Sequence, residues 1–123
     1  RINLPEEKQR VENAFAALTP TVDGAAVTVR GSINRPPMHE SAATALYAVA
    51  QRVAPEVGIT DLRGIAVGGG SDGNFTAAIG VPTLDGLGAC GGGAHADTEY
   101  IKVSKLGERA ALNAAIAREL VNR

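Results

Sequence analysis

A histidine in a glycine-rich stretch is the clearest candidate for chemistry in this sequence. His95 follows Gly91–Gly93, and Asp97 and Glu99 come after it at alternate positions. An imidazole beside carboxylates can act as a metal ligand, or as an acid or base near neutral pH. The other histidine, His39, lies far away in the sequence, and zinc sites need three or four protein ligands. The residues alone leave two alternatives for His95: a metal ligand, or a loop histidine that hydrogen-bonds to backbone or water.

Another glycine-rich run lies about twenty residues before Gly91–Gly93. Gly68, Gly70 and Gly73 have the spacing of the dinucleotide-binding fingerprint, in which a glycine loop between a strand and a helix cradles a phosphate. The fingerprint also needs an acidic residue about 20 positions further on, whereas Asp85 comes earlier, and the helix predicted after the glycines is short. Nucleotide binding and a simple tight turn both remain open.

Arg35 and Cys90 are two further candidates. Arg35 precedes Pro36 and Pro37, whose rings stiffen the backbone, so its guanidinium is well placed to bind a carboxylate with two hydrogen bonds. The alternative is a surface arginine at a domain junction. Cys90 has no basic partner specified by the sequence, and a free cysteine is most often a small buried hydrophobic residue rather than a nucleophile.

The composition excludes several classes of protein. The 123 residues carry a net charge of −1 and no basic stripe, so nothing predicts nucleic-acid binding. No apolar run approaches the roughly 20 residues of a membrane-spanning helix. The single cysteine rules out an internal disulfide bond. The chain opens without an initiator methionine or a signal peptide, which predicts a processed chain or a fragment.

The spacing of apolar residues predicts four helices. They cover residues 6–18, 41–53, 72–79 and a C-terminal stretch that begins at Ser104. Asp72 and Ser104 are expected to cap the third and fourth helices. The last helix is predicted to bury one apolar stripe and to leave Glu108, Arg109 and Arg118 in water. That stripe comprises Leu112, Ala115, Ile116 and Leu120.

Short apolar or alternating runs predict strands between these helices. They lie at residues 2–4, 27–29, 62–67 and 81–84. The glycine and prolines of residues 31–37 break the pattern and predict a crossing between two domains. We therefore expect an α/β fold, with helices packed on a layered sheet, preceded by a strand-helix-strand piece of a smaller α+β domain.

Four segments together resemble the C-terminal part of the M20 family of zinc metallopeptidases, and most closely its glutamate carboxypeptidase branch. They match in order over essentially the whole chain, which makes the combination more specific than any single motif. The segments are Asn34–Met38, Gly68–Phe75, Gly80–Gly88 and Gly93–Ile101.

This resemblance implies two domains and a role for each candidate residue. Residues 1–31 would end the lid domain, through which the family usually forms homodimers, and residues 32–123 would be the second half of a two-zinc catalytic domain. His95 would be a zinc ligand, and Arg35 would hold the free carboxylate of the substrate. The pocket for that carboxylate would be lined by the backbone of Gly69, Gly70 and Ser71, with Asp72 capping the helix behind it. At Cys90 the branch usually has an aliphatic residue.

The resemblance also implies that the remaining catalytic groups precede this chain. The other zinc ligands and the glutamate base of the family belong to the first half of the catalytic domain, and their motifs do not occur here. The complete enzyme would hydrolyse an amide bond next to a free carboxylate, in a peptide with a C-terminal acidic residue or in an N-acyl amino acid. The 123 residues alone are expected to be inactive and to bind zinc weakly.

Two other classes of function remain as alternatives. One is a noncatalytic binding or dimerisation module built on the first 31 residues, and the other is a nucleotide-binding α/β domain that would take NAD or ATP. No membrane or nucleic-acid partner is expected. The sequence leaves the compartment open and favours the cytoplasm.

Overall fold

The computed structural model describes residues 1–122 as a mostly helical chain with one small sheet. The α-helices are α1 (Glu7–Ala16), α2 (Thr44–Val53), α3 (Gly73–Ala78) and α4 (Leu106–Val121). Three short 3-10 helices accompany them, at η1 (Glu40–Ala42), η2 (Ala54–Val57) and η3 (Val103–Lys105). Strands β1 (Gly91–Gly92) and β2 (Tyr100–Ile101) form a two-stranded antiparallel sheet. None of the helices in the described part of the chain is both long and apolar enough to cross a bilayer.

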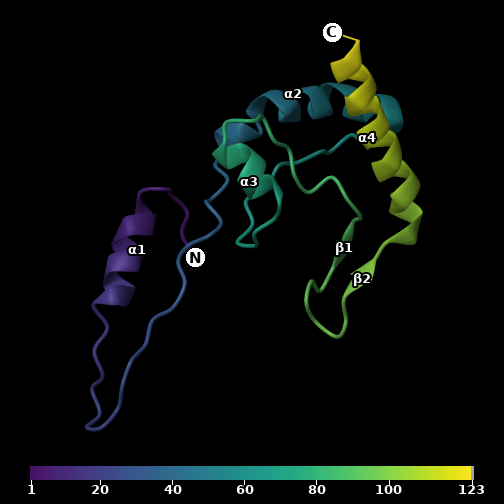
Figure 1. Ribbon diagram of the computed structural model, residues 1–123. Helices are drawn as coiled ribbons and strands as arrows, with labels where there is room; N and C mark the ends of the chain where they lie inside the picture. Colours follow the sequence, from purple (N-terminus) through teal and green to yellow (C-terminus); the bar gives the residue numbers. More distant parts are fainter. Residues whose placement is uncertain (123) are drawn as a thin grey trace.

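The core forms where α2 and η2 pack against α4, at one end of the molecule (Figure 1). The residues of this core are Val49, Ala50, Val53, Ala54, Leu112, Ala115 and Ile116. Two ion pairs reinforce the contact at its rim, with 2.7 Å from Arg52 to Glu119 and 2.8 Å from Arg118 to Glu56. The apolar stripe predicted for α4 is thus buried at three of its four positions, while Leu120 is 38% exposed.

Side chains of α2 and α4 hold the two glycine-rich segments near this core. The Tyr47 hydroxyl donates to the carbonyl of Leu62 and accepts from the amide of Gly64, so it fixes the chain that leads into Gly68–Gly70. Arg109 of α4 donates to the carbonyls of Gly86 and Gly88 at 2.9 and 3.0 Å, just before β1. Arg109 therefore positions the chain that leads into Gly91–Gly93, rather than lying free in water as predicted.

Helix α1 lies at the opposite end of the molecule and buries none of its residues (Figure 1). Pro5 lies just before the N-cap Glu6, and Glu7 in the first turn suits the positive end of the helix dipole. Residues 17–32 continue from it as exposed chain without a helix or strand. The carboxylate of Glu12 accepts a hydrogen bond from the amide of Ile33, which ties the returning chain to α1.

The four predicted strands do not form in the described residues. Residues 2–4, 27–29, 62–67 and 81–84 have no ladder partner, and Val27 and Val29 are 46% and 47% exposed. A strand is stabilised by a neighbour that may be distant in sequence, and residues 1–122 offer these segments none. The helices agree with the expected α/β class, but the layered sheet is not seen in this part of the chain.

Candidate active site

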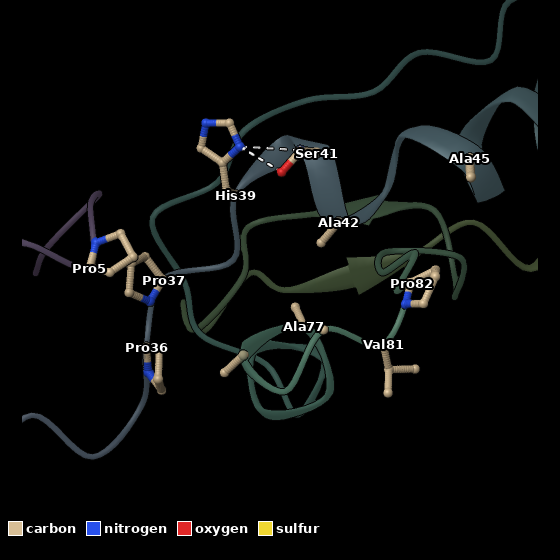
Figure 2. A pocket seen from close by; sticks show the side chains of 12 residues that line it. Pro5, Pro36, Pro37, His39, Ser41, Ala42, Ala45, Ala77, Val81 and Pro82 are labelled. Carbon is tan, nitrogen blue, oxygen red and sulfur yellow. Dashed lines mark hydrogen bonds between the residues drawn. The ribbon is translucent and has the colours of Figure 1, made fainter.

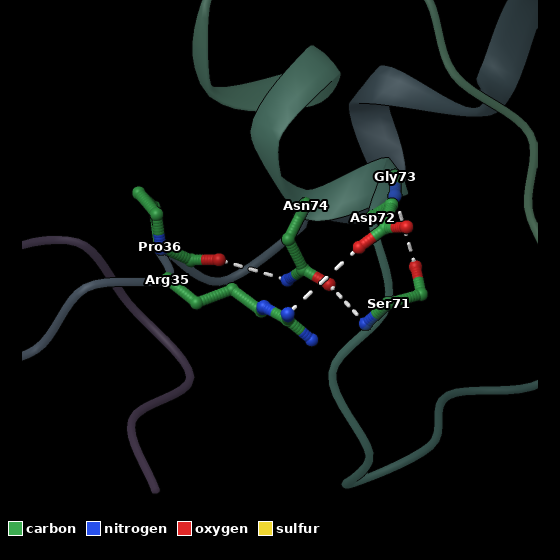
Figure 3. A network of polar contacts seen from close by, with 6 residues as sticks. All are labelled: Arg35, Pro36, Ser71, Asp72, Gly73 and Asn74. Carbon is green, nitrogen blue, oxygen red and sulfur yellow. Dashed lines mark hydrogen bonds and ion pairs between the residues drawn. The ribbon is translucent and has the colours of Figure 1, made fainter.

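Arg35 lies against the first glycine-rich loop and the start of α3 (Figure 3). Its guanidinium carbon is 5.0 Å from the centroid of the Phe75 ring, within the range of a cation–π contact. Its Nη2 atom is 3.8 Å from the Asp72 carboxylate, which is longer than a hydrogen bond. The side chain of Arg35 is 39% exposed, so its N–H groups can still bind a carboxylate from solution.

The absence of a side chain at Gly70 allows Arg35 to approach the loop. A Cβ at Gly70 would lie 2.9 Å from Cδ and 3.1 Å from Nη1 of Arg35. A Cβ at neighbouring Gly69 would meet nothing within 4 Å. Of these two glycines, Gly70 is the one that the packing of Arg35 requires.

Ser71 and Asn74 fasten the loop to the first turn of α3. The Ser71 hydroxyl accepts from the amide of Gly73 at 3.1 Å, and the Asn74 side-chain oxygen accepts from the amide of Ser71 at 2.8 Å. The reciprocal bonds resemble a capping box, in which two side chains satisfy free N–H groups at a helix start. The prediction that Asp72 caps α3 is therefore wrong, because its side chain makes no capping bond and faces Arg35 instead.

A similar correction applies to Ser104. This residue lies inside η3, and Lys105 occupies the N-cap position of α4 without a side-chain capping bond. The first turn of α4 instead carries an ion pair of 2.6 Å between Lys105 and Glu108. The hydrogen bond from its ammonium to Glu108 raises the pKa of Lys105 above its ordinary value.

His95 lies in the exposed loop that joins β1 to β2. It is the one residue other than glycine with a positive φ in residues 1–122, at 67°. The turn closes through hydrogen bonds from Ala96 to Gly93 and from Glu99 to Ala96, both of 2.9 Å. The amide of His95 also donates to the Glu99 carboxylate at 3.4 Å. Unusual φ values in non-glycine residues concentrate at functional sites, where the surrounding structure holds them.

The β1–β2 pairing sets the position of this loop. Gly91 pairs with Ile101 and Gly92 with Tyr100, and the amide of Lys102 donates to the Cys90 carbonyl at 2.8 Å. A Cβ at Gly91 would collide with the Tyr100 carbonyl, so a side chain there is incompatible with the ladder. Cys90 is partly buried beside the ladder, and nothing in its surroundings in this structure marks it as a nucleophile.

The described residues do not by themselves complete a metal centre. No group of three or more His, Cys, Asp or Glu side chains within residues 1–122 could hold a metal ion. His95 offers a suitable imidazole, but zinc needs three or four protein ligands. His39 belongs to no such group of described residues, and its Nδ1 atom contacts the Ser41 hydroxyl at 3.0 Å at the start of η1. The donor set present here thus fits one ligand of a zinc site and not a whole site.

An open groove of about 590 Å³ lies beside the Arg35 segment (Figure 2). Pro36 and Pro37 form part of one wall, and His39 and Ser41 supply polar groups. The rest of the lining is apolar and comes from the residues before α1, from η1 and α2, from the end of α3 and from residues 80–82 after it. The groove contains neither Arg35 nor His95.

The structure brings Arg35 together with the Gly70 and Ser71 loop, and it places His95 elsewhere. The β1–β2 loop and the start of α3 are separate in Figure 1, and no hydrogen bond or ion pair within residues 1–122 joins residues 91–101 to residues 68–75. Sequence reasoning missed Asn74 and Phe75. A signal was present for Asn74, because Ser71-x-x-Asn74 has the spacing of a capping box.

The short α3 argues against the nucleotide-binding alternative. A dinucleotide fingerprint requires a strand before the glycines and a crossover helix after them. Here residues 62–67 form no strand, and α3 has only 6 residues. The Gly68–Gly73 run therefore lacks the structural context that this fingerprint needs.

Comparison with known families gives a match over most of the chain. The model of Peptidase family M20/M25/M40 matches residues 4–119, which is nearly the entire chain. Comparison with curated proteins and with solved structures gives no significant match.

Proposed function

Because the chain belongs to Peptidase family M20/M25/M40, we propose that it forms part of a zinc-dependent hydrolase that cleaves an amide bond next to a free carboxylate. The substrate would be a peptide with a C-terminal acidic residue or an N-acyl amino acid, as in the glutamate carboxypeptidase branch. Residues 1–31 would belong to a lid domain that forms a homodimer, and residues 32–123 to the catalytic domain.

The observation that carries this proposal is the environment of Arg35. Its guanidinium rests on the Phe75 ring and on Gly70, while its ionic contact with Asp72 is long. A carboxylate that replaced this contact with two parallel hydrogen bonds would gain a charge-assisted interaction. The amides of Gly69 and Gly70 lie in the same exposed loop and would supply additional donors. Arg35 would therefore recognise the carboxylate of the substrate.

His95 would supply one ligand to the zinc. Its loop is held by the β1–β2 ladder, and the positive φ at this position fixes where the imidazole leaves the backbone. A single imidazole cannot complete the coordination shell, so the other ligands would come from residues outside this chain. On this proposal, the 123 residues alone neither hydrolyse amides nor bind zinc tightly.

The test measures the two roles separately in the natural polypeptide that contains this chain. Arg35→Ala is expected to raise KM for an N-acyl-glutamate about tenfold or more, because a charge-assisted bond contributes roughly 1.5–3 kcal/mol. His95→Asn is expected to lower the zinc content, since asparagine tolerates a positive φ but lacks the imidazole. Unchanged KM in the first variant together with unchanged zinc content in the second would refute the proposal.

A further inference from the structure

Asn74 links the Arg35 segment to the glycine-rich loop (Figure 3). Its side-chain amide nitrogen donates to the carbonyl of Pro36 at 2.8 Å, and its side-chain oxygen accepts from the amide of Ser71 at 2.8 Å. The bond to Pro36 joins residues 38 positions apart in sequence, whereas the bond to Ser71 is local. One side chain thus sets the spacing between the segment that carries the guanidinium and the loop that faces it.

The other contacts of Arg35 cannot replace this link. The ion pair with Asp72 spans 3.8 Å to a fully exposed carboxylate, and the cation–π contact involves a partly exposed ring. Exposed contacts of both kinds contribute little, roughly 1 kcal/mol or less each. Among residues 1–122, the bond from Asn74 to Pro36 is the one hydrogen bond that joins residues 34–37 to residues 68–75. It is also partly buried, so water competes less for its partners.

The backbone at Pro36 transmits this restraint to Arg35. The two prolines have fixed φ angles and disfavour helical geometry in the residue before each. With the Pro36 carbonyl held by Asn74 and the φ angle of Pro36 fixed by its ring, the peptide bond that joins Arg35 to Pro36 is restrained as well. A guanidinium that is already oriented loses less conformational entropy when it binds a planar carboxylate.

We propose that Asn74 is a positioning residue, which holds the Pro36 carbonyl so that Arg35 meets the carboxylate of the substrate in the correct orientation. This inference rests on the proposed function, because it takes Arg35 as the group that binds that carboxylate. Asn74 does not touch the substrate, so its effect is on substrate binding and not on the chemical step.

The experiment uses Asn74→Leu and Asn74→Ala in the intact enzyme, with an N-acyl-glutamate as the substrate. Leucine has a similar volume to asparagine but no amide, so it controls for loss of packing. Alanine is the best helix former, so it controls for loss of helix stability. Both variants are expected to raise KM about tenfold while kcat changes less than twofold. A merely structural role would lower kcat and the melting temperature and would not shift KM alone.

Thr76→Val provides a matched control. The Thr76 hydroxyl also bonds from α3 to a residue outside the helix, at 2.8 Å from the Thr83 hydroxyl, but its hydrogen bonds do not involve residues 34–37. This variant is expected to leave KM unchanged. If one Asn74 variant fails to fold, as judged by circular dichroism, the other decides the test.

Arg35→Ala separates failure of this inference from failure of the proposed function. If Arg35→Ala raises KM and neither folded Asn74 variant does, the positioning role is refuted while the role of Arg35 remains. If Arg35→Ala itself leaves KM unchanged, the proposed role of Arg35 is refuted and the inference with it. A rise in KM for both residues, with kcat retained in the Asn74 variants, supports the inference.

Discussion

The guanidinium of Arg35 stacks on the Phe75 ring, with 5.0 Å between Cζ and the ring centroid. The two residues lie on segments that are 40 positions apart, yet Phe75 in α3 directly supports the group proposed to bind substrate. Since the ring is 44% exposed, its contribution comes from this contact more than from burial in the core.

Phe75→Leu is expected to raise KM two- to fivefold, because an exposed cation–π contact is worth about 0.5–1 kcal/mol. Steady-state kinetics of the intact enzyme with an N-acyl-glutamate measures this change. Phe75→Tyr keeps an aromatic face and is expected to behave like the parent. A leucine variant with the same KM as the tyrosine variant would contradict the assigned role of the ring.

Gly70→Ala is expected to displace Arg35 and raise KM about tenfold. The added Cβ would come within 2.9 Å of Cδ of Arg35, so the flexible side chain must move from its observed position. Gly69→Ala is the comparison, because its Cβ would meet nothing within 4 Å. The same kinetic assay applies, and an effect of Gly69→Ala as large as that of Gly70→Ala would speak against this packing.

Gly91→Ala is expected to open the β1–β2 ladder and so release the His95 loop. The new Cβ would collide with the backbone carbonyl of Tyr100. Hydrogen exchange measures the result, because the amide of Lys102 loses protection when its bond to Cys90 breaks. Gly88→Ala, whose Cβ would meet nothing within 4 Å, is expected to leave this exchange rate unchanged.

Leu112→Ala is expected to lower the free energy of unfolding by about 2–5 kcal/mol, the usual cost of a cavity in a core. Leu112 of α4 is fully buried in the core that α4 forms with α2, whereas Leu120 of the same helix is 38% exposed. Leu120→Ala is the comparison, and it is expected to lower the free energy of unfolding by less than about 1 kcal/mol. Urea denaturation of the two variants measures both losses, and equal losses would contradict the observed core.

Local patterns were sufficient to predict the helices. The apolar spacing that predicts residues 41–53 corresponds to η1 and α2, and the stripe of α4 is buried at Leu112, Ala115 and Ile116. Caps and strands were predicted less well. The caps of α3 and α4 depend on which neighbouring side chain accepts hydrogen bonds from the free N–H groups of the first turn. Strands depend on partners remote in sequence.

The candidate site was only partly accessible from the sequence. The resemblance pointed to Arg35 and the Gly69–Ser71 loop, and the structure brings these segments together. The contact between Asn74 and Pro36 could not be predicted from their positions in the sequence, because it depends on how α3 packs. The role of His95 as a zinc ligand stays a prediction.

The exposed stretch of residues 17–32 has a consequence for how this chain responds to proteases. An endopeptidase needs an extended segment that it can bind along its cleft, and these residues are solvent-accessible and outside every helix and strand. Cleavage there would remove a peptide containing α1 and leave the packed helix pair whole, since none of the core residues lies before Val49. Digestion at residues 17–32 would thus leave a C-terminal product that keeps every core residue.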